Sequence, residues 1–220
     1  MRSIIGMAVV AAIVLSPWGS QQAFAAPAFT TKYVYYKVSG DNAASVYMSM
    51  LKRGPHVGGA KAYAATSAES SQRGKLEFTN SCRITDYQYS IAFTIRLPKL
   101  ADESSLSPAA QSRWRQFSSF LRKHEETHRA IWMGCAREID NKVKNLRGRT
   151  CDEVDKRAQA IREAIQSACN RKHMAFDAAE QKRLAKHPFV KMVIAPAYKP
   201  STVTTNLAPK KRRKSEALFN

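Results

Sequence analysis

The sequence is short of acidic residues: 17 Asp and Glu stand against 36 Lys and Arg, which gives a formal net charge of +19. A charge this high favours polyanionic neighbours such as lipopolysaccharide, acidic wall polymers, anionic lipid headgroups or nucleic acid. It carries no information about the fold, and no feature of the chain selects nucleic acid as a specific partner. The charge therefore bears on partners and not on architecture.

Long apolar runs are also scarce. Beyond its first 26 residues the chain has no stretch of the roughly 18 consecutive apolar residues that a membrane helix needs. Before that point, Arg2 is followed by an apolar run from Ile4 to Leu15 and by the small residues Ala23 and Ala25. This order is typical of a secretory signal peptide. We assign residues 1–25 to a signal peptide and expect a periplasmic or secreted mature protein without a transmembrane segment.

Cysteine is used sparingly, at Cys82, Cys135, Cys151 and Cys169. No pair has the C-x-x-C spacing of a zinc site built from four cysteines, whereas an even number in an exported chain indicates two disulfides. A Cys151–Cys169 bridge is unfavourable, because a continuous helix of that length spans about 27 Å. Of the remaining pairings we favour Cys82–Cys151 with Cys135–Cys169.

Two segments alternate apolar and polar residues with the period of a β-strand. The first is Tyr33–Val38, and the second is Tyr87–Leu97, which we expect to stop at Pro98. Residues Leu76–Thr79 are placed to pair with the second strand across a turn at Asn80–Ser81. We therefore predict an antiparallel sheet.

Two long helices are expected to follow the strands. Ser107 is a good N-cap and Pro108 suits the first helical position. From Trp114 to Leu146, apolar residues recur at steps of three and four, and Gly148 is the expected C-cap. A second helix, roughly Asp152–Lys186, is predicted to fold back as an antiparallel hairpin. The predicted class is therefore α+β, with the sheet packed on both helices.

The domain is expected to span residues 29–186 and to end in a basic tail, residues 187–220. Four prolines and the cluster Lys210–Lys214 lie in this segment, which has no periodic apolar pattern. Such a composition is typical of a mobile segment. A role in binding an envelope polyanion and a solvated tail without a dedicated role are both compatible with it.

The most informative motif is His124-Glu125-Glu126-Thr127-His128, an H-E-x-x-H pattern inside the first long helix. A spacing of four residues places both imidazoles on one helix face, so that both can reach one ion. Zinc accepts neutral imidazole nitrogen and, in catalytic sites, takes a third protein ligand while leaving a position for water. Glu125 is then the expected general base, taking a proton from the attacking water.

The position of the two histidines strengthens this interpretation. Both lie in the apolar stripe, between Leu121 and Ile131, where core residues are expected. A buried polar group costs roughly a few kcal/mol unless it has a partner, and one metal ion would provide a partner for both rings. The alternative is a pair of core histidines hydrogen-bonded to the neighbouring helix.

Glu126 has a different expected role. At its angle on the helix it should point to the flank, where Arg122, Lys123 or Arg129 is close enough to pair with it. We interpret it as a surface carboxylate.

The third metal ligand is not set by the motif. Cys135 lies on the same stripe but about 10 Å beyond His128, too far for the same ion. If the connection between the helices centres near Arg149, the residues opposite the two histidines fall near positions 170 to 174, give or take one helical turn. His173 and Asp177 are both candidates there, and Glu163 is a more distant one.

With these residues, the chain resembles a bacterial domain family of unknown function described as predicted secreted zinc-dependent proteases. The similar features run from about Tyr33 to Leu184 and include the strand that ends in Leu97-Pro98, the H-E-x-x-H motif and a Phe176-Asp177 pair. The resemblance implies a zincin-like α+β fold, peptidase activity and Asp177 as the third ligand. Where the family often continues with a Thr-x-His-Gly-like stretch, this chain has Glu180-Gln181-Lys182-Arg183.

The sequence therefore predicts an exported zinc metallopeptidase with His124, His128 and Asp177 as ligands and Glu125 as the base. Its partner would be a peptide or protein, held in extended form by an edge strand. Two alternatives remain. One is a zinc-dependent amide hydrolase of peptidoglycan, and the other is a non-enzymatic protein that binds an envelope polyanion.

Overall fold

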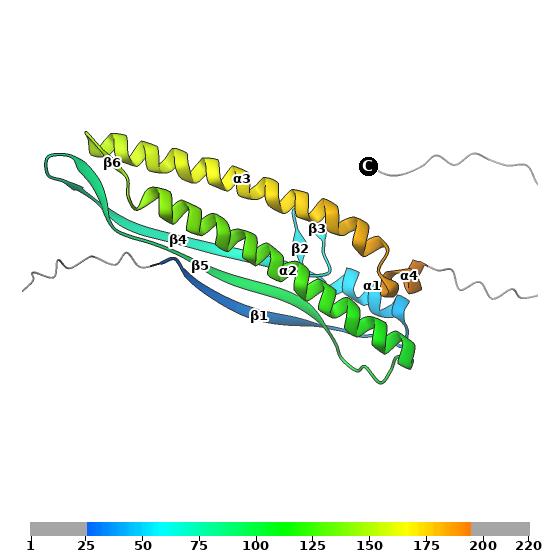
Figure 1. The fold of residues 1–220 in the computed structure, drawn as a ribbon. Coiled ribbons are helices and arrows are strands. Elements are labelled where there is room, and N and C mark those ends of the chain that lie inside the picture. The colour runs from blue at the N-terminus through cyan, green and yellow to red at the C-terminus, as the bar shows by residue number, and fades with distance from the viewer. Residues whose placement is uncertain (1–25, 195–220) are drawn as a thin grey trace, which may run out of the picture.

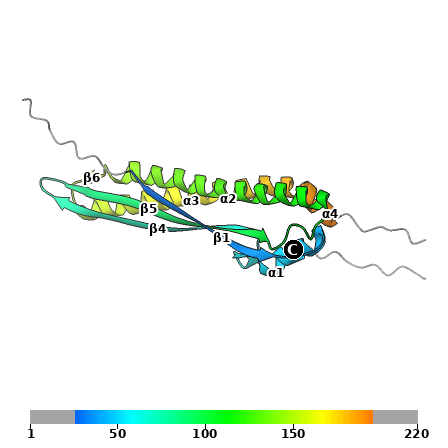
Figure 2. The same ribbon diagram turned by 90° about the horizontal axis from the view of Figure 1, so that it is seen from below.

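The structure is a computed structural model and describes residues 26–194. It is an α+β arrangement in which two long helices, α2 and α3, lie along one face of a long, narrow sheet (Figure 1). Seen along the perpendicular direction, both helices stay on the same side of the strands (Figure 2). The elements are β1 (Ala28–Val38), α1 (Ala43–Arg53), β2 (His56–Val57), β3 (Ala60–Lys61), β4 (Ala65–Phe78), β5 (Cys82–Leu100), α2 (Pro108–Val143), β6 (Arg147–Gly148), α3 (Cys151–Ala185) and α4 (Pro188–Ile194).

The sheet is mixed, and the prediction of a purely antiparallel sheet is wrong. Its main strands lie in the order β1-β5-β4, with the short β6 also paired to β5. Strands β4 and β5 form the expected antiparallel hairpin, whereas β1 runs parallel to β5, from Ala28 opposite Ser90 to Val38 opposite Leu100. Alternation of apolar and polar residues is the same in both orientations, so the pattern in β1 could not reveal its direction.

Strand β5 also continues past Pro98, the residue expected to end it. The pairing with β4 reaches only to Arg96, and beyond that point β5 is paired with β1 alone. A proline lacks the N–H that a fully paired central strand would use, but it is tolerated where one side of the strand is free. Near its first residues, β5 is irregular at Asp86, which has a φ of 53°. The irregularity shifts the alternation of side chains by one residue, so that Ile84 and Tyr87 are both buried.

The helical hairpin matches the prediction except at the end of α2. Ser107 caps α2 by accepting a hydrogen bond from the Ala110 amide, and Thr150 caps α3 in the same way through Glu153. Helix α2 ends at Val143. Gly148 is not its C-cap but lies in β6, where it pairs with Cys82 of β5. The two helices run antiparallel along the sheet (Figure 1).

The core extends beyond the expected end of the domain. Trp114 and Phe117 of α2 belong to one buried cluster with Val38 of β1, Met50 of α1 and buried residues of β5 and α4. Phe189 of α4, which is 0% exposed, stacks on Phe117. The predicted domain ends at residue 186, whereas Phe189 and Val190 of α4 belong to this core. The assigned signal peptide and the cluster Lys210–Lys214 lie outside the described residues.

Two disulfides join the helices to each other and to the sheet, in the favoured pairing. Cys82 is bonded to Cys151 and Cys135 to Cys169, with Cα–Cα distances of 5.0 and 6.1 Å. Two disulfides are compatible with an extracellular or periplasmic location. Within residues 26–194, no helix has both the length and the apolar character needed to cross a membrane.

We expect the Cys135–Cys169 bridge to contribute strongly to stability. It joins α2 to α3 across a sequence separation of 34 residues. The loop-closure entropy of such a link corresponds to about 4 kcal/mol. The double variant Cys135→Ala/Cys169→Ala should therefore lose about that much free energy of unfolding, measured by urea denaturation at fixed metal content. An unchanged denaturation midpoint would contradict this role.

Candidate metal centre

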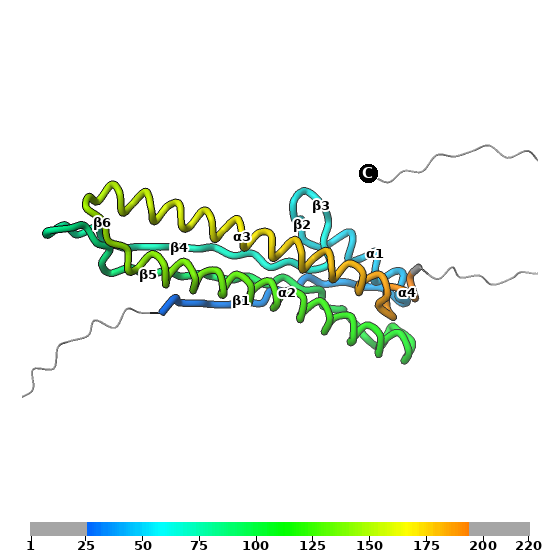
Figure 3. Tube along the Cα trace, turned by 45° about the horizontal axis from the view of Figure 1, so that its top comes forward, coloured from blue at the N-terminus to red at the C-terminus, as the bar shows by residue number. Residues whose placement is uncertain are grey.

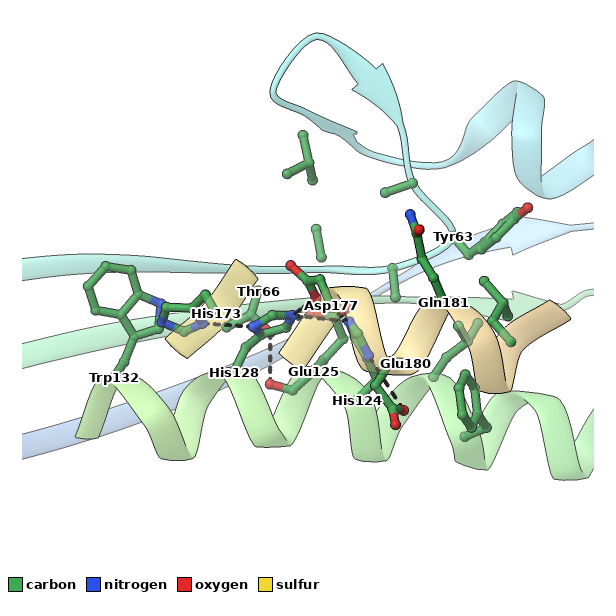
Figure 4. A pocket seen from close by; sticks show the side chains of 17 residues that line it. Tyr63, Thr66, His124, Glu125, His128, Trp132, His173, Asp177, Glu180 and Gln181 are labelled. Atoms are coloured by element: carbon green, nitrogen blue, oxygen red, sulfur yellow. Dashed lines mark hydrogen bonds and ion pairs between the residues drawn. The ribbon is translucent and has the colours of Figure 1, made fainter. Parts of the chain in front are cut away.

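Three donor atoms from α2 and α3 meet at one point beside the sheet (Figure 4). His124 Nε2 and His128 Nε2 are 3.0 Å apart. Asp177 Oδ1 lies 2.9 Å from His128 Nε2 and 3.3 Å from His124 Nε2. The four-residue spacing brings the histidines together on α2, and the antiparallel packing of α3 brings Asp177 opposite them.

The spacing of these atoms suits a tetrahedral metal ion. Zinc bound at about 2.0–2.1 Å places neighbouring ligand atoms roughly 3.3 Å apart. The separations of 2.9, 3.0 and 3.3 Å are close to one face of such a tetrahedron. Two imidazoles and one carboxylate are also a donor set that zinc accepts, so these residues fit the ion.

The environment favours the neutral imidazoles that metal binding requires. Burial lowers the pKa of both His124 and His128, against the opposing effect of the Asp177 carboxylate. Phe176 packs on both rings, with centroid distances of 4.8 Å to His124 and 5.2 Å to His128. The protein therefore holds both rings with their lone pairs available to a cation.

Glu125 lies between the histidines in sequence and is 4% exposed. Its Oε2 lies 2.8 Å from the hydroxyl of Thr66 on β4, which is also 3.0 Å from the Glu125 carbonyl oxygen. Burial raises the pKa of Glu125 to about 7, and the hydrogen bond from Thr66 opposes that rise. A carboxyl group with a pKa near neutrality is suited to exchange protons in either direction at physiological pH.

Replacing Thr66 tests how much its hydrogen bond to Glu125 contributes to the free energy of unfolding. Thr66→Val removes the hydroxyl while keeping the side-chain shape, and leaves a buried carboxyl with one partner fewer. We expect the metal-free protein to lose about 1–3 kcal/mol of unfolding free energy. Thr66→Ser keeps the hydroxyl and should stay close to the parent in urea denaturation. Equal stability of the valine and serine variants would show that the hydrogen bond contributes nothing.

The donor atoms and Glu125 open into a cavity of about 460 Å³. Apolar side chains form much of its wall. The β2–β3 hairpin projects next to α3 (Figure 3), and its exposed residue Val57 is one of the residues that line the cavity. The lining residues away from the donor atoms include Val57, Ala62, Tyr63, Ala64, Ala65, Phe120, Leu121, Trp132, Gln181 and Leu184. The cavity can therefore take up a substrate with apolar groups next to the candidate centre.

The other two candidate ligands, Glu163 and His173, do not join the group of three donor atoms. Glu163 is exposed and accepts a hydrogen bond from Gln159 on its own helix. His173 is close to the centre, but its Nδ1 faces His128 Nδ1 at 2.8 Å and not the three donor atoms. Glu126 is on the flank of α2 as expected, yet its partner is the Tyr33 hydroxyl at 3.0 Å and not a basic residue of its own helix.

Sequence reasoning missed two polar residues at the site, Thr66 and Glu180. Thr66 stands in a strand far from the motif, and no local pattern marks it. Glu180 is buried, with its Oε2 3.9 Å from His124 Nδ1 and its Oε1 bonded to Arg183 at 2.6 Å. It lies three residues after Asp177, on the same face of α3, and that spacing is a signal that could have identified it.

Fold and site together define a disulfide-bonded α+β protein with a candidate metal centre on a helical hairpin. The chain belongs to the DUF922 family, described as bacterial proteins of unknown function, whose model matches residues 33–185. No curated protein and no solved structure matches the chain.

Proposed function

We propose that this protein is a periplasmic or secreted zinc-dependent metallopeptidase. The observation that carries the proposal is the meeting of His124, His128 and Asp177 at separations of 2.9–3.3 Å, beside the buried Glu125 and inside an open cavity. These three residues would hold the ion. When bound, zinc supplies Lewis acidity, which polarises a carbonyl group and acidifies water.

Glu125 would transfer the protons of the reaction. With a pKa of about 7, its carboxylate takes a proton from the attacking water and passes it to the leaving amine. Thr66 holds the Oε2 end of the carboxyl group through the 2.8 Å hydrogen bond, so the group keeps one orientation.

The sheet offers a means of holding an extended substrate. Among the described strands, β4 has a partner, β5, on one side only. Its first residues, Ala65 and Thr66, line the cavity next to Glu125. Free backbone groups on such an edge can pair with an extended peptide and bring its carbonyl groups to the site. This arrangement favours a peptide over a small compact substrate.

The experiment compares two amide substrates with one protein. Mature protein is purified, stripped with a chelator, reloaded with one equivalent of zinc and incubated with denatured protein or with purified peptidoglycan sacculi. We expect cleavage of denatured protein that the chelator abolishes and zinc restores. Release of wall fragments alone would replace the peptidase by a peptidoglycan amide hydrolase. Zinc binding without cleavage of either substrate would refute an enzymatic role.

A further inference from the structure

His173 contacts the candidate centre without facing the donor atoms, and the proposed function gives it no task. We propose, on the basis of the zinc site proposed above, that His173 is a positioning residue. His173 would accept a hydrogen bond from His128 and so fix the orientation of the His128 ring. The Cys135–Cys169 disulfide would keep the proton of His173 on its other ring nitrogen. One face of α3 would then supply both a ligand, Asp177, and the group that orients a ligand of α2.

The first step concerns the proton of His128. Its Nε2 faces His124 and Asp177 at 3.0 and 2.9 Å, so this nitrogen must be free of a proton to bind a cation. A neutral imidazole then carries its proton on Nδ1. Within residues 26–194, the group at hydrogen-bond distance from that nitrogen is His173 Nδ1, at 2.8 Å. For this contact to be a hydrogen bond, His173 Nδ1 has to be the acceptor.

The second step explains why His173 accepts at Nδ1. Its other nitrogen, Nε2, lies 3.8 Å from Cys169 Sγ, and Cys169 is bonded to Cys135. A disulfide sulfur has no hydrogen, so it can only accept. The favourable arrangement places the proton of His173 on Nε2, which donates weakly to sulfur, and leaves Nδ1 with a lone pair. The disulfide therefore favours the tautomer that His128 needs.

Packing keeps the His173 ring in this orientation. The ring lies 5.0 Å from His128 and 4.8 Å from Trp132, measured between centroids. On α3, the group that faces Nδ1 of His124 is Glu180 Oε2, at the longer distance of 3.9 Å. The two histidines thus differ in how firmly α3 orients them.

Two substitutions of His173 distinguish the effect of its hydrogen bond to His128 from the effect of its size. His173→Leu fills the space without an acceptor, whereas His173→Asn places an amide oxygen near the position of Nδ1. Loss of an orienting partner typically weakens metal binding by about 10–100-fold. We expect that loss of zinc affinity in His173→Leu, measured by competition with a chromogenic chelator, and recovery to within a few-fold of the parent in His173→Asn. The cobalt-loaded leucine variant should keep the shape of the parent's visible spectrum, because the ligands are unchanged.

Several results would overturn the inference. A leucine variant that binds zinc as tightly as the parent would remove the positioning role. An asparagine variant as weak as the leucine variant, or a changed cobalt spectrum in the leucine variant, would make His173 itself a ligand. Thermal unfolding of the metal-free variants tests whether a loss of affinity reflects a damaged fold, and a large drop would assign His173 a structural role. If the parent itself binds no zinc, the proposed function fails, a result distinct from all of these.

Discussion

Glu125→Gln is expected to lower peptide hydrolysis by about a thousandfold while leaving zinc bound. The substitution keeps the size of the side chain and an oxygen that can face Thr66, but glutamine cannot take up a proton. A positioned general base contributes about 10²–10⁴-fold to a rate. Because Glu125 is not one of the three donor residues, the metal content of the variant should equal that of the parent. The measurement pairs initial rates with metal analysis of the same preparation.

Glu126 provides a matched control for this variant. It is the next residue on the same helix, but it accepts a hydrogen bond from Tyr33 on the flank of α2. Glu126→Gln makes the same chemical change and keeps an oxygen for that bond. We expect it to retain hydrolysis close to that of the parent. If both variants lose activity equally, or if Glu125→Gln remains active, Glu125 is not the base.

Asp177→Ala is expected to weaken zinc binding by more than about 100-fold. Loss of a group that merely orients a ligand already costs about 10–100-fold, and Asp177 supplies one of the three donor atoms. Its side chain is half exposed, so the substitution opens little space in the core. Chelator competition gives the dissociation constant directly, and the thermal stability of the metal-free variant should match that of the parent.

The control for this prediction comes from the same helix. Glu163 is an exposed carboxylate of α3 that lies outside the cavity and was the more distant candidate ligand. Glu163→Ala removes the same charge from α3 and should leave zinc affinity unchanged. A variant of Asp177 that binds as tightly as the Glu163 variant would exclude Asp177 as the third ligand.

The helical part of the molecule could be predicted because its signals are local. The cap at Ser107, the apolar stripe of α2 and the fold-back near Arg149 were sufficient to predict an antiparallel hairpin. The length of a continuous helix excluded one cysteine pairing, and the structure has the pairing favoured among the rest. The same predicted hairpin placed Asp177 and His173 opposite the two histidines.

The direction of β1 and the partners of Glu125 could not be predicted in this way. They depend on contacts between segments far apart in sequence, such as β1 with β5, and Thr66 with Glu125. Nothing in the local pattern of either strand specifies its neighbour. The end of α2 was missed for a related reason, since Gly148 is a plausible C-cap locally but is drawn into pairing with Cys82. The choice between Asp177 and His173 needed side-chain positions, because both lie on the same face of α3.

The central claim is that His124, His128 and Asp177 bind one zinc ion. Elemental analysis of the purified mature protein, after dialysis against metal-free buffer, tests it most directly. The account predicts one zinc per chain in the parent and close to none in His124→Ala/His128→Ala. A folded parent that contains no metal, and takes up none from a zinc-loaded buffer, would contradict the account.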